Sequence, residues 1–363
     1  MITIDARWIN ASGIGTYLRN LLPGLVAALP EREFSLLGSV SALEAVAGLQ
    51  RSNVRLVDAG APMYSVSEQF ELARKVPRET QLFFATHYNI PLFYRGTMLV
   101  TIYDLFHLAM PDLVGGLHKR LYARAMFNAV RRRAAAIITI SQFTKDELIR
   151  LTRPGAQEII PISLGVEDSW FRIQKAVSPH PQKYILFVGN VKPHKNLGAL
   201  IEAFSRICGE IPHDLLLVGR NEGFITGDRH VMQQAQGLNG RVRFTGHVDD
   251  KALKSYFAHA DAMVFPSLYE GFGLPPLEAM AAGCPVLVSD VGPMPELFGD
   301  AALYCDPHRP EDIAGKLLGL LKHDDLQEVL RNRGLERART YTWDKCVTRT
   351  AAVIEQLLVR QHL

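Results

Sequence analysis

The sequence lacks the usual carboxylate platform for a catalytic divalent metal, because it contains no Asp-x-Asp triplet. Cysteine is scarce as well: its four copies stand far apart, without the paired spacing of zinc ligands or of a disulfide framework. We therefore expect no metal, no other cofactor and no disulfide bond. The four cysteines are Cys208, Cys284, Cys305 and Cys346.

Long apolar runs and a strong net charge are also missing. No segment approaches the roughly 18 uninterrupted apolar residues of a membrane span. The first residues, Met1 to Arg7, show no basic region followed by an apolar stretch, so we expect no secretory signal and a cytoplasmic location. The net charge of +3 is too small to indicate a nucleic-acid partner.

The positive charge is concentrated in one segment. Residues 95–153 carry ten Lys or Arg against four Asp or Glu, whereas residues 171–363 carry 22 of each sign. Within this segment residues 117–133 predict a basic helix, and two interpretations stay open: a solvated surface face, or a docking surface for an anionic membrane or a phosphate-bearing acceptor. Cations and apolar residues fall on separate stripes of this helix, Arg120, Arg124 and Arg131 on one and Leu117, Leu121 and Ala125 on the other.

The length of 363 residues predicts two domains of roughly 150–200 residues each. Short apolar runs alternate with helical patterns in both halves, and their lack of clean alternation is typical of parallel strands buried on both faces. Each half is therefore predicted to be a doubly wound α/β domain. The predicted strands cover residues 2–4, 82–84, 98–102, 136–140, 184–189, 215–219, 242–244, 262–265 and 285–288.

A polar stretch with Lys175, Pro179 and Pro181 indicates the linker between the domains. We place the first domain at residues 1–175 and the second at residues 176–340. Residues 341–363 predict a helical tail, for which packing back on the first domain is one arrangement left open.

The most informative stretch is residues 264–278, which place Glu270 and Glu278 eight positions apart around a loop rich in glycine and proline. The loop follows a predicted strand and precedes a helix that begins at Leu277, opened by one of the prolines. A strand, a glycine loop and a helix N-terminus form a natural anion site, because the first helical N–H groups lack internal partners. We expect this stretch to bind a phosphate or sugar hydroxyls.

The same order recurs at the N-terminus, where Gly13 and Gly15 lie between the first strand and a helical pattern from Thr16 to Leu22. Alone this signal is weak, and a tight turn without function explains it nearly as well. Polar residues also follow the other strands of the first half, where ligand crevices form. A single histidine among them is more often structural than catalytic. These residues are His87, Tyr103, Asp104, His107 and Ser141.

Several motifs together resemble one family over nearly the full length: the retaining nucleotide-sugar glycosyltransferases of family 4, including bacterial mannosyltransferases of surface-polysaccharide synthesis. The most diagnostic is the pair of glutamates separated by seven residues, here Glu270 and Glu278. The other matching segments are Ser12–Gly15, Ser141–Thr144, Gly246–Val248, Ala260–Ala262, Pro266–Ser267 and Glu278–Val286. The resemblance implies the GT-B fold, two Rossmann-like domains facing across a cleft, of which the first binds the acceptor and the second the nucleotide sugar.

The resemblance also implies roles for single residues. Lys195 matches the lysine that neutralises the departing diphosphate, a role in which a fixed cation stabilises developing charge. Glu270 is expected to hold hydroxyls of the donor sugar rather than to act as a nucleophile, and Glu278 to accept hydrogen bonds from the ribose. Further donor contacts are expected from Gly13, Gly15, His247, Val248 and the backbone N–H groups of Phe272, Gly273 and Leu274.

Two positions depart from the family pattern. Asn190 stands where the family usually has an arginine, which leaves Lys192 or Arg220 as possible substitutes. Tyr103 stands where many members have a histidine near the reacting sugar. Its role falls to Asp104, to His107 or to the Tyr103 hydroxyl, and the sequence leaves these three open.

The implied reaction moves a hexose from a nucleotide diphosphate sugar to a saccharide or lipid-linked saccharide, as in lipopolysaccharide or exopolysaccharide synthesis. It proceeds with retention and without a metal, because Lys195 and helix N-termini take the place of the ion. GDP-mannose is the favoured donor, and UDP-linked glucose or N-acetylglucosamine is the alternative. Two rivals are a nucleotide-sugar 2-epimerase and a non-catalytic sugar-binding protein.

Overall fold

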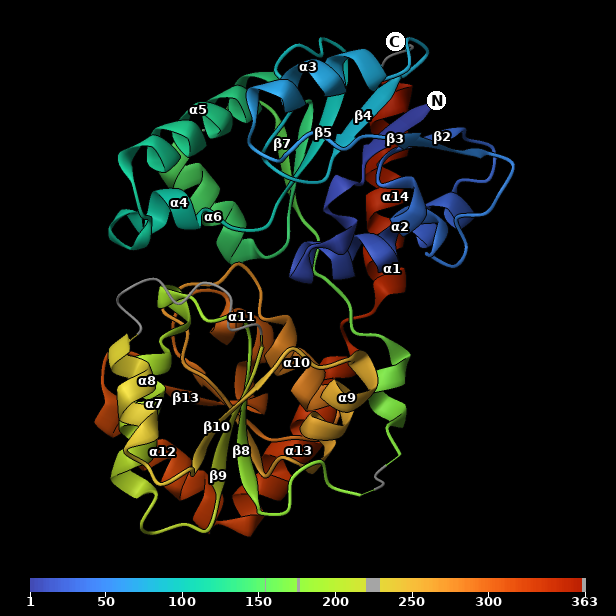
Figure 1. Ribbon diagram of the computed structural model, residues 1–363. Helices are drawn as coiled ribbons and strands as arrows, with labels where there is room; N and C mark the ends of the chain where they lie inside the picture. Colours follow the sequence, from blue (N-terminus) through green and yellow to red (C-terminus); the bar gives the residue numbers. More distant parts are fainter. Residues whose placement is uncertain (154, 175–176, 220–228, 361–363) are drawn as a thin grey trace. The chain divides into compact units, whose positions relative to one another are not determined.

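The computed structural model describes residues 1–153, 155–174, 177–219 and 229–360. The chain forms two compact units (Figure 1), the first made of Met1–Gly165 with Thr342–Leu363 and the second of Val166–Tyr341. The predicted domain boundary, between residues 175 and 176, lies outside the described residues. The chain thus leaves the first unit at residue 165 and returns to it at residue 342.

The first unit is built on a parallel sheet of seven strands in the order β3-β2-β1-β4-β5-β6-β7. The central strands are fully buried, as expected when helices cover both faces. The strand order reverses between β1 and β4, which makes their carboxyl ends the place where a ligand crevice is expected. The strands are β1 (Ile2–Asp5), β2 (Phe34–Gly38), β3 (Val54–Asp58), β4 (Leu82–Ala85), β5 (Thr97–Ile102), β6 (Ala136–Thr139) and β7 (Glu158–Pro161).

The second unit has a parallel sheet of six strands in the order β10-β9-β8-β11-β12-β13. Here the order reverses between β8 and β11, so their carboxyl ends are the corresponding place in this unit. The two doubly wound parallel sheets predicted from the sequence are therefore confirmed. The strands are β8 (Tyr184–Val188), β9 (Asp214–Val218), β10 (Val242–Gly246), β11 (Ala262–Phe265), β12 (Val286–Ser289) and β13 (Leu303–Cys305).

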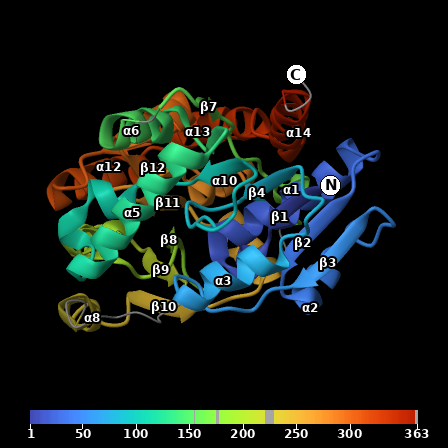
Figure 2. The same ribbon diagram turned by 90° about the horizontal axis from the view of Figure 1, so that it is seen from above.

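Helix α14, the last helix of the chain, lies side by side with α1, the first (Figures 1 and 2). The buried side of α14 includes Ile354 and Leu357, which contribute to the core of the first unit. The helices of this unit are η1 (Arg7–Asn10), α1 (Ser12–Ala28), α2 (Val40–Glu44), α3 (Val66–Lys75), α4 (Phe106–Ala109), η2 (Pro111–Leu113), α5 (Leu117–Arg133), α6 (Gln142–Thr152) and α14 (Trp343–Val359).

In the second unit α7 and α12 pack together on one side of the sheet, and α10 and α13 on the other (Figure 1). The helices are η3 (Asp168–Arg172), η4 (Pro193–Lys195), α7 (Leu197–Ile207), α8 (Arg229–Gln236), α9 (Asp250–His259), α10 (Leu274–Ala281), α11 (Met294–Phe298), η5 (Gly299–Ala301), α12 (Pro310–Lys322) and α13 (Asp324–Arg339).

The predicted helix 117–133 is confirmed as α5, but two predicted helix starts are wrong. Helix α10 begins at Leu274 rather than Leu277, since both prolines fit its first turn, where no N–H donor is needed. Gly13 and Gly15 lie in the first turn of α1 rather than in a loop, because the short helix η1 makes the connection from β1.

Candidate active site

A contact between opposite charges marks the carboxyl ends of β8 and β11 in the second unit. Lys195 Nζ lies 2.5 Å from Glu270 Oε1, and each side chain is 15% exposed. The ammonium group also lies 4.8 Å from the centre of the Phe265 ring, at the end of β11. The residues predicted to neutralise the diphosphate and to hold the donor sugar therefore meet where the strand order of this sheet reverses.

Hydrogen bonds fix the two loops that carry this pair to one another. The Leu268 amide donates to the His194 carbonyl oxygen at 2.8 Å. Asn196 Nδ2 donates to the carbonyl oxygens of Pro266 at 3.1 Å and Pro307 at 2.6 Å. The backbone segments that carry the lysine and the carboxylate are thus joined to each other before any ligand binds.

The first turn of α10 follows directly in the chain. Its N-cap, Gly273, has φ of +121°, and a Cβ there would come within 3.1 Å of the Met294 side chain. Only glycine suits this position. Phe272 is buried and Leu274 half-buried. The N–H groups of such a first turn have no partners within the helix and favour anions.

Glu278 lies in the second turn of α10 and is half-buried. Desolvation of its carboxyl group raises the pKa to about 8, and the negative charges of Glu167 and Asp250 add to this, while Lys254 opposes it. At neutral pH this carboxyl group is therefore mostly protonated in the free protein. A ligand whose hydroxyls donate to a carboxylate at this position has to displace that proton.

The other predicted donor-binding residues of this unit lie at the carboxyl ends of β8 and β10. Asn190 is half-buried and Lys192 exposed in the loop after β8, while His247 is exposed and Val248 half-buried after β10. Arg220, one of the two suggested substitutes for the family arginine, lies outside the described residues.

The two glycines at the start of α1 differ in their surroundings. A Cβ on Gly15 would come within 2.5 Å of the Ile9 carbonyl oxygen, whereas a Cβ on Gly13 would meet no atom within 4 Å. Gly15 is therefore required by the close packing of α1 on η1. Gly13 is exposed and leaves the backbone of the first turn open to an approaching group.

The structure brings together several of the polar residues predicted in the first unit. The rings of Tyr88 and His107 lie 6.2 Å apart, and those of His87 and Tyr88 4.2 Å apart. Asp104 Oδ1 accepts a hydrogen bond from the Phe106 amide at 2.9 Å. Burial, and next the charge of His107, lower the pKa of His87 to about 3, so that imidazole is neutral at physiological pH.

Tyr103 is placed differently from these residues. Its hydroxyl oxygen is buried and has no hydrogen-bond partner among the described residues, and its ring packs edge-on against Tyr17 at 5.5 Å. Burial raises its pKa well above the ordinary value, so the hydroxyl group stays neutral. Ser141 caps α6, since its Oγ accepts a hydrogen bond from the Thr144 amide at 3.0 Å.

Helix α5 turns its leucines outward. Leu117 is 69% exposed and Leu121 58% exposed. Of the three arginines predicted to share a stripe, Arg124 is exposed, whereas Arg120 and Arg131 are half-buried. The core is instead contacted by Ala123, Met126, Phe127 and Val130.

Sequence reasoning missed a buried charge cluster at the end of β1. Arg7 donates to both oxygens of Asp5, at 2.8 and 2.7 Å, and its Nη1 lies 2.6 Å from Glu68 Oε1. Asp5 ends β1 and Arg7 follows it, and charged residues at the end of a strand are a signal that could have found them. The burial of Glu68 has no such signal, because its Ser65-x-x-Glu68 pattern predicts only a helix start.

No group of three or more His, Cys, Asp or Glu side chains among the described residues could hold a metal ion. None of the helices in the described part of the chain combines the length and apolar character needed to cross a membrane.

Residues 168–337 match the family described as glycosyl transferases group 1. The chain is 34% identical over 227 residues to O-antigen chain mannosyltransferase B of Escherichia coli, which covers 60% of this chain and 59% of the relative. It is 31% identical over 222 residues to O-antigen chain mannosyltransferase RfbU of Salmonella typhimurium, covering 61% and 60%. The chain thus spans about three-fifths of the length of these curated relatives.

The structure is similar to that of sucrose-phosphate synthase from Thermosynechococcus elongatus, with a TM-score of 0.79, 19% sequence identity and coverage of 99% of each chain. At this identity the likeness concerns the fold. It extends over both units, whereas the family match lies in the second. The protein therefore has two parallel-sheet α/β units with a fold like that of the GT-B glycosyltransferases, and its residues 168–337 match the glycosyl transferases group 1 family.

Proposed function

We propose that the protein is a retaining glycosyltransferase that moves a hexose from a nucleoside diphosphate sugar to a saccharide or lipid-linked saccharide acceptor. The observation that carries the proposal is the contact between Lys195 and Glu270 at the point of strand-order reversal, beside the first turn of α10. A cation and a helix N-terminus suit a diphosphate, and a neighbouring carboxylate suits sugar hydroxyls. The family match covers these same residues.

In the proposed reaction Lys195 stabilises the charge that develops on the leaving diphosphate, so no metal ion is needed for this purpose. When the donor binds, the Glu270 carboxylate moves away from Lys195 and accepts hydrogen bonds from hydroxyls of the transferred sugar. Glu278, once deprotonated, accepts from the ribose. Asp104 and His107, at the end of β5, are the proposed polar groups near the anomeric carbon.

Mannose carried by GDP is the favoured donor, because two relatives at 31% and 34% identity are mannosyltransferases. A screen of GDP-mannose, UDP-glucose and UDP-N-acetylglucosamine by ligand-induced thermal shift discriminates the candidates, since a ligand that binds the native state raises its melting temperature. A shift with GDP-mannose alone is expected. A shift confined to a UDP-sugar would make the protein a glucosyl- or N-acetylglucosaminyltransferase instead.

Replacing Lys195 by Ala tests the catalytic role. Loss of one group that stabilises transition-state charge lowers kcat by about 10²–10³-fold, measured as sugar transfer to an α-linked mannobiose in the presence of chelator. Lys183→Ala is the matched control, because Lys183 is 69% exposed and precedes β8 at the opposite end of the sheet. Equal activity of both variants would contradict the proposal, and conversion of the donor without any acceptor would favour a 2-epimerase.

A lipid-linked acceptor is held in a membrane, so the proposal also includes a surface that binds the membrane. Helix α5 carries six Lys or Arg and no Asp or Glu, and it exposes two leucines. An exposed helix that combines cations with apolar side chains suits the interface of an anionic lipid bilayer. We propose that α5 docks the protein on the inner face of the cell membrane, where a lipid-linked acceptor is presented.

A further inference from the structure

Tyr64 has a backbone conformation that is unusual for its residue type. Its φ is +63°, in the left-handed region, where a bulky residue is strained by about 1–3 kcal/mol. Its side chain is nevertheless 46% exposed, so burial of the ring does not compensate the strain. Strain of this kind persists where the surrounding structure enforces it, and it gathers at functional sites.

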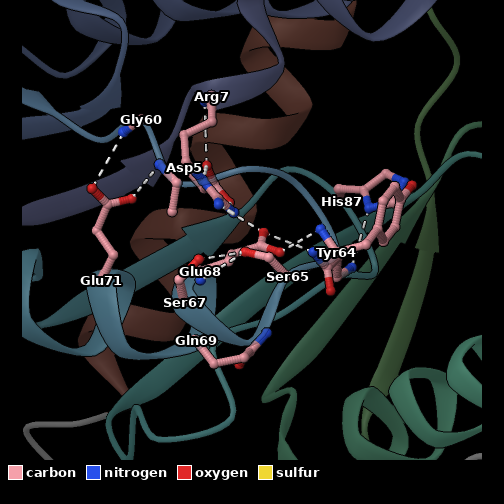
Figure 3. A network of polar contacts seen from close by, with 12 residues as sticks. Asp5, Arg7, Gly60, Tyr64, Ser65, Ser67, Glu68, Gln69, Glu71 and His87 are labelled. Carbon is pink, nitrogen blue, oxygen red and sulfur yellow. Dashed lines mark hydrogen bonds and ion pairs between the residues drawn. The ribbon is translucent and has the colours of Figure 1, made fainter.

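A single buried carboxylate, that of Glu68, holds this conformation (Figure 3). Glu68 Oε2 accepts a hydrogen bond from the Tyr64 amide at 2.6 Å. Its Oε1 accepts from Asn89 Nδ2 at 2.7 Å and lies 2.6 Å from Arg7 Nη1. The residue is fully buried. Segments after β1 and β4 are thus tied to the segment before α3, which carries Tyr64.

The ring of Tyr64 stands among other aromatic rings at the carboxyl ends of β1 and β4. Its centre lies 5.7 Å from that of Trp8, 5.8 Å from that of Tyr122 and 6.1 Å from that of His87. Burial raises the pKa of the Tyr64 hydroxyl, a hydrogen bond with Tyr88 opposes this, and the charges of Glu68 and Asp104 raise the pKa further. Asp104, proposed to act near the reacting sugar, follows β5, the strand next to β4 in the same parallel sheet.

We propose that Tyr64, with Trp8 beside it, is a stacking platform for the acceptor saccharide, and that Glu68 is a positioning residue that holds the platform in place. The inference rests on the proposed glycosyltransferase function. One face of a pyranose ring presents C–H groups, which pack on an aromatic ring, while its hydroxyls hydrogen-bond at the edges. Tyr and Trp provide rigid amphipathic contact area at little cost in conformational entropy. A ring fixed in advance lowers the entropy cost of binding further.

Three single variants test the platform in steady-state transfer to α-linked mannobiose. Tyr64→Gly removes the ring and tolerates the positive φ, so the melting temperature is maintained while the acceptor KM rises about tenfold. kcat at saturating acceptor and the donor KM stay within about twofold. Tyr64→Phe keeps the ring and an acceptor KM close to that of the parent protein. Phe93→Ala, which removes another exposed aromatic ring, leaves the acceptor KM unchanged.

The positioning role of Glu68 is tested by a double-mutant cycle. Glu68→Gln weakens the hold on Tyr64 and raises the acceptor KM, but the same change made in Tyr64→Gly has no further effect on it. A merely structural role of Glu68 would raise KM equally in both backgrounds and would overturn this part of the proposal.

Binding of mannobiose, followed by saturation-transfer NMR, separates this proposal from the proposed function. If no donor supports transfer but Tyr64→Gly still weakens mannobiose binding about tenfold, the function fails and the platform stands. If transfer proceeds and Tyr64→Gly leaves the acceptor KM unchanged, the platform is overturned and the function stands.

Discussion

At the scale of single residues, Glu278 holds a proton that an ordinary glutamate has lost at neutral pH. Its pKa is raised to about 8, first by desolvation and then by the charges of Glu167 and Asp250. The ionised form of this carboxyl group is therefore unfavourable in the free protein. Such a cost is common where a binding site is built at the expense of stability.

This shift predicts a pH dependence of stability. Between about pH 4.5 and pH 8 the folded protein retains a proton that the unfolded chain has released, so the free energy of unfolding contributed by this group falls as the pH rises. Above about pH 8 the contribution of Glu278 to the free energy of unfolding no longer changes with pH. Glu278→Gln removes this fall, as measured by urea unfolding at several pH values. Glu328 is exposed, and Glu328→Gln is the control, in which the free energy of unfolding still falls with rising pH. If the free energy of unfolding changed with pH in the same way in the parent protein and in Glu278→Gln, the pKa of Glu278 would not be raised.

The glycines of α1 predict opposite outcomes for the same substitution. Gly15→Ala places a Cβ against the Ile9 carbonyl oxygen and costs about 1–3 kcal/mol of unfolding free energy. Gly13→Ala meets open space and gains up to about 1 kcal/mol from helix propensity. If the first turn of α1 approaches the donor phosphates as proposed, Gly13→Ala still weakens donor binding, measured by calorimetry. If Gly13→Ala is stable and binds the donor with unchanged affinity, Gly13 does not contribute to the donor site.

At the scale of elements, α5 has one side packed on the core and one side exposed to solvent. Met126, Phe127 and Val130 contact the core of the first unit, so the helix does not need Leu117 and Leu121 for its packing. Exposed leucines beside cations are costly in water and useful at a lipid interface. The apolar stripe seen in the sequence therefore faces solvent.

This arrangement predicts membrane binding that depends on both kinds of side chain. Replacing Leu117 and Leu121 by Ser lowers binding to vesicles with about one-third anionic lipid by more than about tenfold, because each buried leucine contributes about 1.5–3 kcal/mol. Binding of the parent protein also weakens with added salt. Val329→Ser, on α13, exchanges an exposed apolar residue of the second unit and serves as the control. Flotation assays in which all three proteins bind alike would refute the docking role.

At the scale of the whole molecule, each unit has its own core, and the last helix belongs to the first unit. Ile354 on α14 and Leu317 on α12 are both fully buried, one in each unit. The chain is therefore expected to contain two cooperative regions that do not follow the order of the sequence.

Two core truncations test this organisation. Ile354→Ala and Leu317→Ala each cost about 2–5 kcal/mol, as for other buried aliphatic side chains. In native-state hydrogen exchange, Ile354→Ala accelerates exchange in β1 and β4, whereas Leu317→Ala accelerates exchange in β8 and β11. Acceleration in all four strands by either variant would indicate that the two cores unfold as one.

The sequence alone determined the features that depend on local pattern. Buried apolar runs identified most strands of both sheets, the helical pattern of residues 117–133 gave α5 its limits, and the spacing of Glu270 and Glu278 led to the family. These signals are contained in neighbouring residues, since side-chain periodicity and turn chemistry act over a few positions.

Only the tertiary structure decided what depends on distant parts of the chain. It brought Lys195 to Glu270, 75 positions apart, joined Arg7 to Glu68, placed α14 against α1 and turned the leucines of α5 to solvent. The raised pKa of Glu278 and the strained backbone of Tyr64 belong to the same class. Each is set by burial and by the charges and hydrogen bonds that folding collects around the residue, and no local pattern records those surroundings.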